Sequence, residues 1–391
     1  MTDMVPDIVP GRGTEVVAAE PGATLASGAT TTADATATPG TRPRGGVWGA
    51  AWRRFRRDRV GMAGGVVVLA YLVLILLAVT GVVAKGWQQE VGIPDARPAF
   101  AGPPPADEQA AAGPDAALAA LAGAAASSAP QANIDISDVD PLAPRYAEWN
   151  ARAAQFKAQV HPKATTLPLG GDRLGRDVLS KAVKGTEISV SVGVLSALLA
   201  TLIGTALGAL AGFFGGRIGD ALEWLYNVFT AVPDILLFFA FAAVFGRGIG
   251  TLVLILSLVG WTGLYRQVRA EFIKHSRREY VRAAEAIGAS AGVRMFRHIL
   301  PNVSHVILVR MSLLVVGFIK AEVILSYLGL GVSVDQVSWG TMLAESQSEL
   351  ILGHWWQLAA ATVFMALFVT AFSLMADAWR DALDPKLRGA E

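Results

Sequence analysis

Charge-free apolar runs constrain this chain more than any other feature of its sequence. Residues 60–84 contain no charged side chain, and Val, Leu and Ile supply most of the run. At 1.5 Å of rise per residue, a helix of about 20 apolar residues crosses the roughly 30 Å hydrocarbon core of a bilayer. Hydrophobic residues make up 53% of the chain, and its mean hydropathy is +0.45. We therefore expect an integral membrane protein.

Five further apolar runs follow, at residues 188–214, 221–245, 252–265, 306–328 and 358–375. The run 221–245 carries Asp234 at its centre. A central carboxylate costs about 2.5–3.5 kcal/mol on insertion scales, and each nearby Leu, Ile, Phe or Val returns about 0.3–0.6 kcal/mol, so roughly ten such residues offset it. The sequence thus predicts an all-α membrane protein with six transmembrane helices.

Basic side chains predict the orientation of these helices. They crowd four places, which are residues 53–59, the short loop with Arg217, residues 266–297, and the tail with Arg380, Lys386 and Arg388. All four fall on one side if six helices alternate, whereas residues 333–356 contain no Lys or Arg. Because cytoplasmic loops carry the excess of Lys and Arg, both termini are expected in the cytoplasm.

The domain organisation follows from these runs. We expect a disordered cytoplasmic tail at 1–45, a basic amphipathic segment and the first transmembrane helix at 46–84, and an extended, partly disordered external segment at 85–186. That external segment is Ala- and Pro-rich at 94–130, with one short helix expected at 145–160. A five-helix core at 187–379 contains a cytoplasmic loop at 270–303, and a cytoplasmic tail occupies 380–391.

The loop between the fourth and fifth runs has the most informative pattern. Its i, i+3, i+4, i+7 spacing predicts a helix with one face made of Tyr280, Ala283, Ala284 and Ile287. A second face is made of Glu279, Arg282 and Glu285. The first face is narrow and made partly of small residues, so it could lie in a groove of another protein. A solvated amphipathic loop is the alternative interpretation.

Three residues mark the ends of short helices in this loop. Gly288 is expected to end the first helix in the left-handed conformation, where a missing Cβ is useful. Ser290 can cap a second short helix, and Pro301 is expected to stop it. The sequence therefore predicts a compact helix–turn–helix.

The loop sequence YVRAAEAIGASAGVRMFRHILPN, at 280–302, resembles the EAA loop of ATP-binding-cassette (ABC) importer permeases. Ala283, Ala284, Gly288, Leu300 and Pro301 match that signature. The form YVxAAxAxGAS with HILPN is similar to the peptide and nickel branch. Residues 167–189, 322–343 and 377–389 also resemble segments of that branch. The resemblance covers most of residues 50–389 and is nearest to the C-type subunits of dipeptide and oligopeptide importers.

The resemblance implies a bacterial inner-membrane permease, coupled to ATPases through this loop. The residues expected to contact the ATPase are Glu279, Tyr280, Ala283, Ala284, Glu285, Gly288, Ala289, Ser290, Arg297, His298, Leu300 and Pro301. The implied partners are a sister permease in a heterodimer, two ABC ATPases, an external solute-binding protein and the bilayer, with no nucleic acid. No cofactor is expected on this chain. It contains no phosphate-binding loop, so partner subunits must hydrolyse the ATP.

Three polar residues are candidates for the translocation pathway: Asn227, Asp234 and Glu322. Ionisable groups inside a membrane usually face a cavity or a partner. For Asp234 the alternative is a carboxylate satisfied by backbone groups freed at Pro233, and for Glu322 it is a snorkelling or paired carboxylate. Asn227 stands where many relatives carry an acidic residue.

Two further patterns concern packing. Gly204, Gly208 and Gly212 recur every four residues and should let another helix approach closely. A capped turn that orients the second transmembrane helix is expected from Leu169, Gly170, Asp172, Gly175, Arg176 and Asp177. Direct contact of that turn with a solute-binding protein is the alternative.

Other functions remain open from the sequence. The same architecture could import nickel, glutathione or another small solute. An intramembrane enzyme could use Asp234 and Glu322 as an acid pair, and an ungated channel would conduct without nucleotide. The chain has no cysteine, which excludes disulfides, thiol catalysis and Cys-ligated zinc or iron–sulfur sites.

Overall fold

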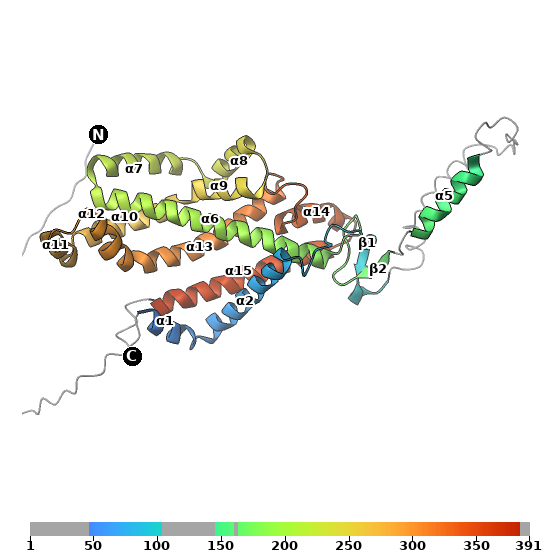
Figure 1. The fold of residues 1–391 in the computed structure, drawn as a ribbon, viewed down its shortest axis with the longest axis horizontal. Coiled ribbons are helices and arrows are strands. Elements are labelled where there is room, and N and C mark those ends of the chain that lie inside the picture. Colours follow the sequence, from blue (N-terminus) through green and yellow to red (C-terminus); the bar gives the residue numbers. More distant parts are fainter. Residues whose placement is uncertain (1–46, 104–144, 160–162, 384–391) are drawn as a thin grey trace, which may run out of the picture. The chain divides into compact units, whose positions relative to one another are not determined.

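The computed structural model describes residues 47–103, 145–159 and 163–383 (Figure 1). The expected tail at 1–45 lies outside the described residues, as do most of the Ala- and Pro-rich tract and residues 384–391. The helices before the core are α1 (Val47–Phe55), α2 (Arg59–Val79), η1 (Ala99–Ala101) and α5 (Tyr146–Gln159). The core helices are α6 (Val178–Phe214), α7 (Gly216–Thr230), α8 (Asp234–Phe245), α9 (Ile249–Gly260), α10 (Thr262–Ser276), α11 (Glu279–Ala286), α12 (Ala291–Val293), η3 (Arg294–Ile299), α13 (Leu300–Tyr327), α14 (Trp339–Ile351) and α15 (Trp356–Leu383).

The first transmembrane run forms α2, which packs along α15 (Figure 1). The Asp58 side chain caps α2 by accepting a hydrogen bond from the Val60 N–H. Gly64 allows the close approach, because a Cβ there would lie 2.6 Å from the carbonyl oxygen of Ala371 on α15. The Tyr71 hydroxyl donates to the Phe364 carbonyl at 2.9 Å.

The second run forms α6, a 37-residue helix that extends along the whole bundle in Figure 1. It begins ten residues before the predicted run. The expected glycine packing is confirmed, because Cβ atoms on Gly204, Gly208 and Gly212 would lie 2.5–2.7 Å from backbone carbonyl oxygens of the α9–α10 segment. α6 and α10 therefore touch backbone to backbone, as small residues permit.

The third run, residues 221–245, is not one helix, and that prediction was wrong. α7 and α8 meet at a bend of 85°. Pro233 explains the break, since it lacks an N–H donor and disfavours helical backbone in the residue before it. Asp234 is consequently the first residue of α8, next to the bend, and is exposed. A carboxylate at a helix N-terminus is stabilised by the helix dipole.

The fourth run is longer than predicted and is also bent. α9 and α10 meet at Trp261 with an angle of 42°. α10 continues to Ser276, well beyond the expected end at residue 265. The predicted loop at 270–303 therefore begins inside this helix.

The segments expected to be external loops contain two strands and a helix, α14, that the sequence analysis did not predict. Within 85–186, β1 (Gly92–Pro98) and β2 (Ala164–Leu167) form a parallel two-stranded sheet, with Gly92 opposite Ala164 and Pro98 opposite Leu167. The expected short helix is confirmed as α5. Between α13 and α15 lies α14, whose start carries a capping box formed by Ser338 and Thr341.

The predicted six transmembrane helices are not confirmed, because the described residues contain three to five candidate membrane spans. In the described residues, three helices are long and apolar enough to cross a membrane: α2, α6 and α15. The count rises to as many as five if α7 with α8, and α9 with α10, each form one span. α13 lies where the fifth run was predicted but is not among these candidates, and it carries Arg310, Lys320 and Glu322.

Candidate functional site

Residues 279–301, here called the 279–301 loop, lie at one end of the bundle (Figure 1). Val281 and Ala284 on α11 are buried, at 1% and 5% exposure. Val281 joins a cluster with Phe272, Met295 and Ile299, which come from α10 and η3. One face of α11 is thus anchored to the bundle by apolar packing.

The predicted helical face is divided in the structure. Ala284 faces its own chain, whereas Tyr280, Ala283 and Ile287 are exposed, Ile287 at 87%. Grouping Ala284 with the other three was therefore wrong. The cause is Val281, whose larger apolar side chain pairs with Ala284 at i, i+3 and turns that edge inward. The exposed edge of Tyr280, Ala283 and Ile287 is available to another protein.

The end of α11 has the predicted conformation. Gly288 has φ +87°, in the left-handed region. The Ala289 N–H donates to the Ala284 carbonyl and the Gly288 N–H to the Glu285 carbonyl, both at 2.9 Å. These two bonds define a Schellman motif, which satisfies carbonyls that the helix leaves unpaired. Gly288 therefore fixes the direction of the chain after α11.

Polar contacts tie the turn to α6. The Ser290 hydroxyl accepts a hydrogen bond from the Val293 N–H, which confirms it as the cap of α12. Arg294 pairs with Glu285 of α11. Its guanidinium also lies over the Phe213 ring of α6, 5.3 Å from the ring centroid. α11, η3 and α6 are thus connected through one arginine.

Pro301 does not stop the second helix, contrary to prediction. The chain runs from α12 through η3, a π-helical turn, directly into α13. Pro301 lies in the first turn of α13, where a missing N–H is tolerated because first-turn donors lack intrahelical partners. Arg297 is exposed, while His298 and Leu300 are half-buried.

Tyr280 contacts the end of α10. Its hydroxyl lies 2.7 Å from Nδ1 of His275. Partial burial raises the pKa of Tyr280, although nearby Arg278 opposes the shift. The phenol therefore stays neutral at physiological pH and can act as a donor or an acceptor.

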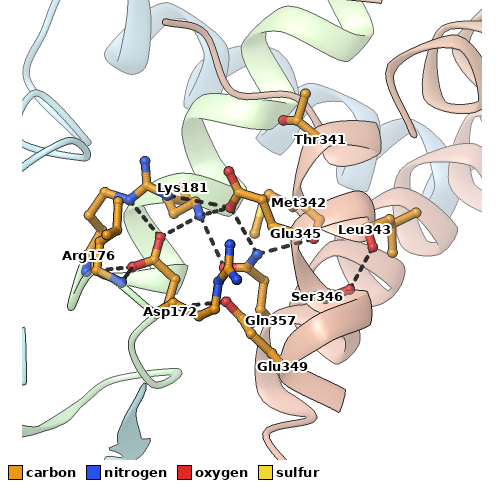
Figure 2. A network of polar contacts seen from close by, with 12 residues as sticks. Asp172, Arg176, Lys181, Thr341, Met342, Leu343, Glu345, Ser346, Glu349 and Gln357 are labelled. Atoms are coloured by element: carbon orange, nitrogen blue, oxygen red, sulfur yellow. Dashed lines mark hydrogen bonds and ion pairs between the residues drawn. The ribbon is translucent and has the colours of Figure 1, made fainter. Parts of the chain in front are cut away.

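A buried polar network lies at the opposite end of α6 (Figure 2). The Lys181 ammonium donates to Asp172 at 2.7 Å, to Glu345 of α14 and to Gln357 of α15 at 3.1 Å. The Arg176 Nε donates to Asp172 at 2.6 Å. Asp172 and Lys181 are 1% and 0% exposed. Asp172 and Lys181 thus each have an opposite charge beside them, as the burial of a charge requires.

The expected capped turn before α6 is confirmed. The Asp177 carboxylate caps α6 by accepting from the N–H groups of Leu179 and Ser180. Asp172 accepts from the N–H groups of Leu174 and Arg176, both at 2.9 Å. The turn is therefore held by two acidic side chains.

Two of the three acidic groups of this network, Asp172 and Glu349, differ in pKa. Burial would raise the pKa of Asp172, but the adjacent Lys181 ammonium and the bonds from Arg176 lower it below the ordinary value. Burial raises the pKa of Glu349 to about 7, against the lowering effect of the Arg173 N–H. One of its oxygens accepts from that N–H at 3.3 Å, and the other is buried without a hydrogen bond among the described residues.

Similarity to known proteins shows the family. A family described as "Binding-protein-dependent transport system inner membrane component" matches residues 204–389, and "N-terminal TM domain of oligopeptide transport permease C" matches residues 46–85. The dipeptide transport system permease protein DppC of Bacillus subtilis (strain 168) is 38% identical over 219 residues, which cover 56% of this chain and 68% of that protein. This chain belongs to the binding-protein-dependent permease family.

Two oligopeptide transport system permease proteins, both named OppC, are also similar to the permease. The one from Bacillus subtilis (strain 168) is 34% identical over 63% of this chain and 81% of its own length. The one from Escherichia coli (strain K12) is 39% identical over 56% of this chain and 72% of its own length. The permease is therefore an inner-membrane, non-catalytic subunit of an ABC importer, in which partner ATPases hydrolyse the ATP.

The structure does not bring the three predicted pathway residues together. Asn227 is exposed on α7, and Asp234 is exposed at the start of α8. Glu322 on α13 is completely buried, and one of its oxygens accepts from the Ser326 hydroxyl at 2.6 Å. Glu322 is surrounded by Ser189, Ser326 and Ser338 from α6, α13 and the start of α14. These surroundings give no support to an acid pair between Asp234 and Glu322.

No pattern in the sequence directly indicates the partners in this network. Lys181 and Glu345 are 164 residues apart, and Lys181 and Gln357 are 176 apart. The available signal was the absence of Lys and Arg around Glu345 and Glu349, together with the charged start of α6. Opposite charges on two otherwise apolar segments favour pairing between them.

Proposed function

We propose that this permease imports dipeptides or oligopeptides, and that the 279–301 loop receives the force of ATP binding. The names of the relatives, dipeptide and oligopeptide transport permeases, support the solute class. A sister permease completes the pathway in a heterodimer, two ATPases bind on the loop side, and an external binding protein delivers the solute. The same architecture with nickel, glutathione or another small solute is the alternative.

The observation that carries this proposal is the construction of the loop. α11 and its C-cap residue present Tyr280, Ala283 and Ile287 outward, while the other edge of α11 is packed against α10 and η3. An element that is rigid on one side and apolar on the other can dock in a groove and transmit displacement. Through Arg294 and Phe213, displacement of α11 reaches α6.

The proposed pathway uses the exposed polar residues Asn227 and Asp234, which flank the bend between α7 and α8. An exposed carboxylate in a membrane-embedded segment needs water or a partner around it. Glu322 enters the pathway only if α14 moves away from α13. Residues 187–379 constitute the transport core, with the basic segment and α2 packed on it.

A matched pair of substitutions tests the docking surface. We expect Ile287→Ser to reduce peptide uptake severalfold, because it removes the most exposed large apolar group of the 279–301 loop from the ATPase contact. Val334→Ser is the control, since Val334 is 89% exposed but follows α13 at the other end of the bundle. Uptake of a labelled tripeptide by cells with equal amounts of each variant is measured. Equal uptake by both variants would contradict the assignment of Ile287 to the ATPase-docking surface.

A further inference from the structure

A basic cavity of about 300 Å³ lies between α10, α13 and α15. Its polar lining consists of Gln267, His305, Arg310 and Arg380, and no acidic residue lines it. His305 lies in the second turn of α13 and Arg380 in the last turn of α15, so the cavity is near the 279–301 loop. Its remaining wall is apolar, from Val306, Val309, Leu313 and Leu383.

The two arginines have no anionic partner among the described residues. Neither Arg310 nor Arg380 forms an ion pair with a described carboxylate, and the Nε of Arg310 is buried without a hydrogen-bond partner. Gly263 of α10 makes room for this side chain, because a Cβ there would lie 2.6 Å from a terminal nitrogen of Arg310. The guanidinium is thus held against α10 with donors unused.

The position of Arg310 in α13 makes its unpaired N–H donors unfavourable in free energy. It lies ten residues after the start of α13, about 15 Å along the helix axis. A guanidinium at such a depth in an apolar helix is unfavourable unless it meets water or an anion. Guanidinium donors match the oxygens of a phosphate group, to which they bind bidentately.

We propose that this cavity binds the phosphate group of an anionic phospholipid. Arg310 and Arg380 contact the phosphate, and an acyl chain lies along Val309 and Leu313. Leu313 is 48% exposed, so the apolar wall is open to a chain entering from the bilayer. Basic pockets between transmembrane helices commonly bind anionic headgroups. A bound lipid would connect α13, which continues from the loop, with α15.

Native mass spectrometry of the intact transporter complex tests this site. The complex is titrated with dihexanoyl phosphatidylglycerol, with dihexanoyl phosphatidylcholine and with inorganic phosphate. We expect the wild type to retain phosphatidylglycerol preferentially, and Arg310→Gln and Arg380→Gln each to weaken its binding about fivefold or more. Arg277→Gln, which alters an exposed arginine outside the cavity, should bind as the wild type does.

Gly263→Ala gives an independent variant if the arginine substitutions impair folding. Its methyl group displaces the Arg310 guanidinium without removing charge, and weaker phosphatidylglycerol binding is expected. Undiminished binding in Gly263→Ala and both arginine variants would overturn the proposal. Equal retention of phosphatidylcholine, or displacement of phosphatidylglycerol by inorganic phosphate alone, would also overturn the assignment to an anionic lipid.

Discussion

Gly288 is the residue on which the geometry of the 279–301 loop depends most. Its φ of +87° is strained for any residue with a Cβ, although no atom lies within 4 Å of where that Cβ would be. Gly288→Ala should therefore cost about 1–2 kcal/mol through backbone strain alone. We expect the end of α11 to shift and the number of solute molecules imported per ATP hydrolysed to fall severalfold in proteoliposomes.

Gly292→Ala is the matched control for Gly288→Ala. It adds the same methyl group to the same loop, also in open space, at a position with no positive φ. Its coupling ratio should equal that of the wild type. Equal ratios in both variants would show that the left-handed turn is unimportant for coupling.

Glu349 should make the stability of the folded permease depend on pH. Its pKa rises from the ordinary value of 4.5 to about 7, so the folded state favours the protonated form. Stability from this group is complete below pH 4.5 and is lost as the pH rises to about 7. Asp172, whose pKa is lowered, titrates below this window, and Asp95, whose pKa burial raises, acts in the same direction as Glu349.

Thermal unfolding of the purified complex, followed by tryptophan fluorescence from pH 4.5 to 8, measures this effect. Wild-type Tm should fall across the window, and Glu349→Gln should flatten the fall. Asp95→Asn measures how much of the fall in Tm comes from Asp95. A wild-type Tm that rises with pH in this range would contradict the assignment.

Local features of single residues were predictable because they depend on neighbours in sequence. Gly288 and Ser290 were assigned correctly since a left-handed turn and a helix cap are set within a few residues. Pro301 was not, because a proline ends one helix or begins the next depending on the backbone before it. Lys181 was missed since two of its three partners, Glu345 and Gln357, lie more than 160 residues away.

At the scale of elements, the close contact between α6 and α10 is the helix packing that the glycine spacing predicted. A Cβ on Gly208 would lie 2.7 Å from the Tyr265 carbonyl oxygen, and backbone cannot move as a side chain can. Gly208→Ala should therefore force the helices apart and destabilise the permease by about 1–3 kcal/mol. A lower Tm and a reduced fraction of monodisperse complex in fluorescence-detected chromatography are expected.

Gly250→Ala serves as the control for this packing. No atom lies within 4 Å of its added methyl group, and its φ is ordinary. Its Tm should be unchanged or slightly raised. If Gly208→Ala melts as Gly250→Ala does, α6 and α10 are not packed as described.

Apolar runs located most of the helices but not their breaks. Runs 221–245 and 252–265 are detected as continuous because hydropathy averages over the residues that bend the chain, Pro233 and Trp261. α14 and the β1–β2 pair were missed since neither is a long apolar run. The glycine spacing on α6 correctly predicted a close helix contact, because small residues let the backbone of another helix approach.

At the scale of the whole molecule, α6 connects two differently built ends. Its start is fixed by the charges of Lys181, Asp172 and Glu345, and its end touches the 279–301 loop through Phe213. The membrane class and the family were predictable from composition and four separated motifs. The predicted six spans are not confirmed, since two pairs of helices are bent and the charged α13 is not among the three to five candidate spans of the described residues.

Site-directed photo-crosslinking in native membranes tests the central claim that the 279–301 loop binds an ATPase. The chain has no cysteine, so Ile287→Cys and Val334→Cys each provide a single thiol for benzophenone maleimide. We predict that the thiol at position 287 forms an adduct with a nucleotide-hydrolysing subunit and that the thiol at position 334 forms none. Absence of an ATPase adduct at position 287, or an equal adduct at position 334, would contradict the account.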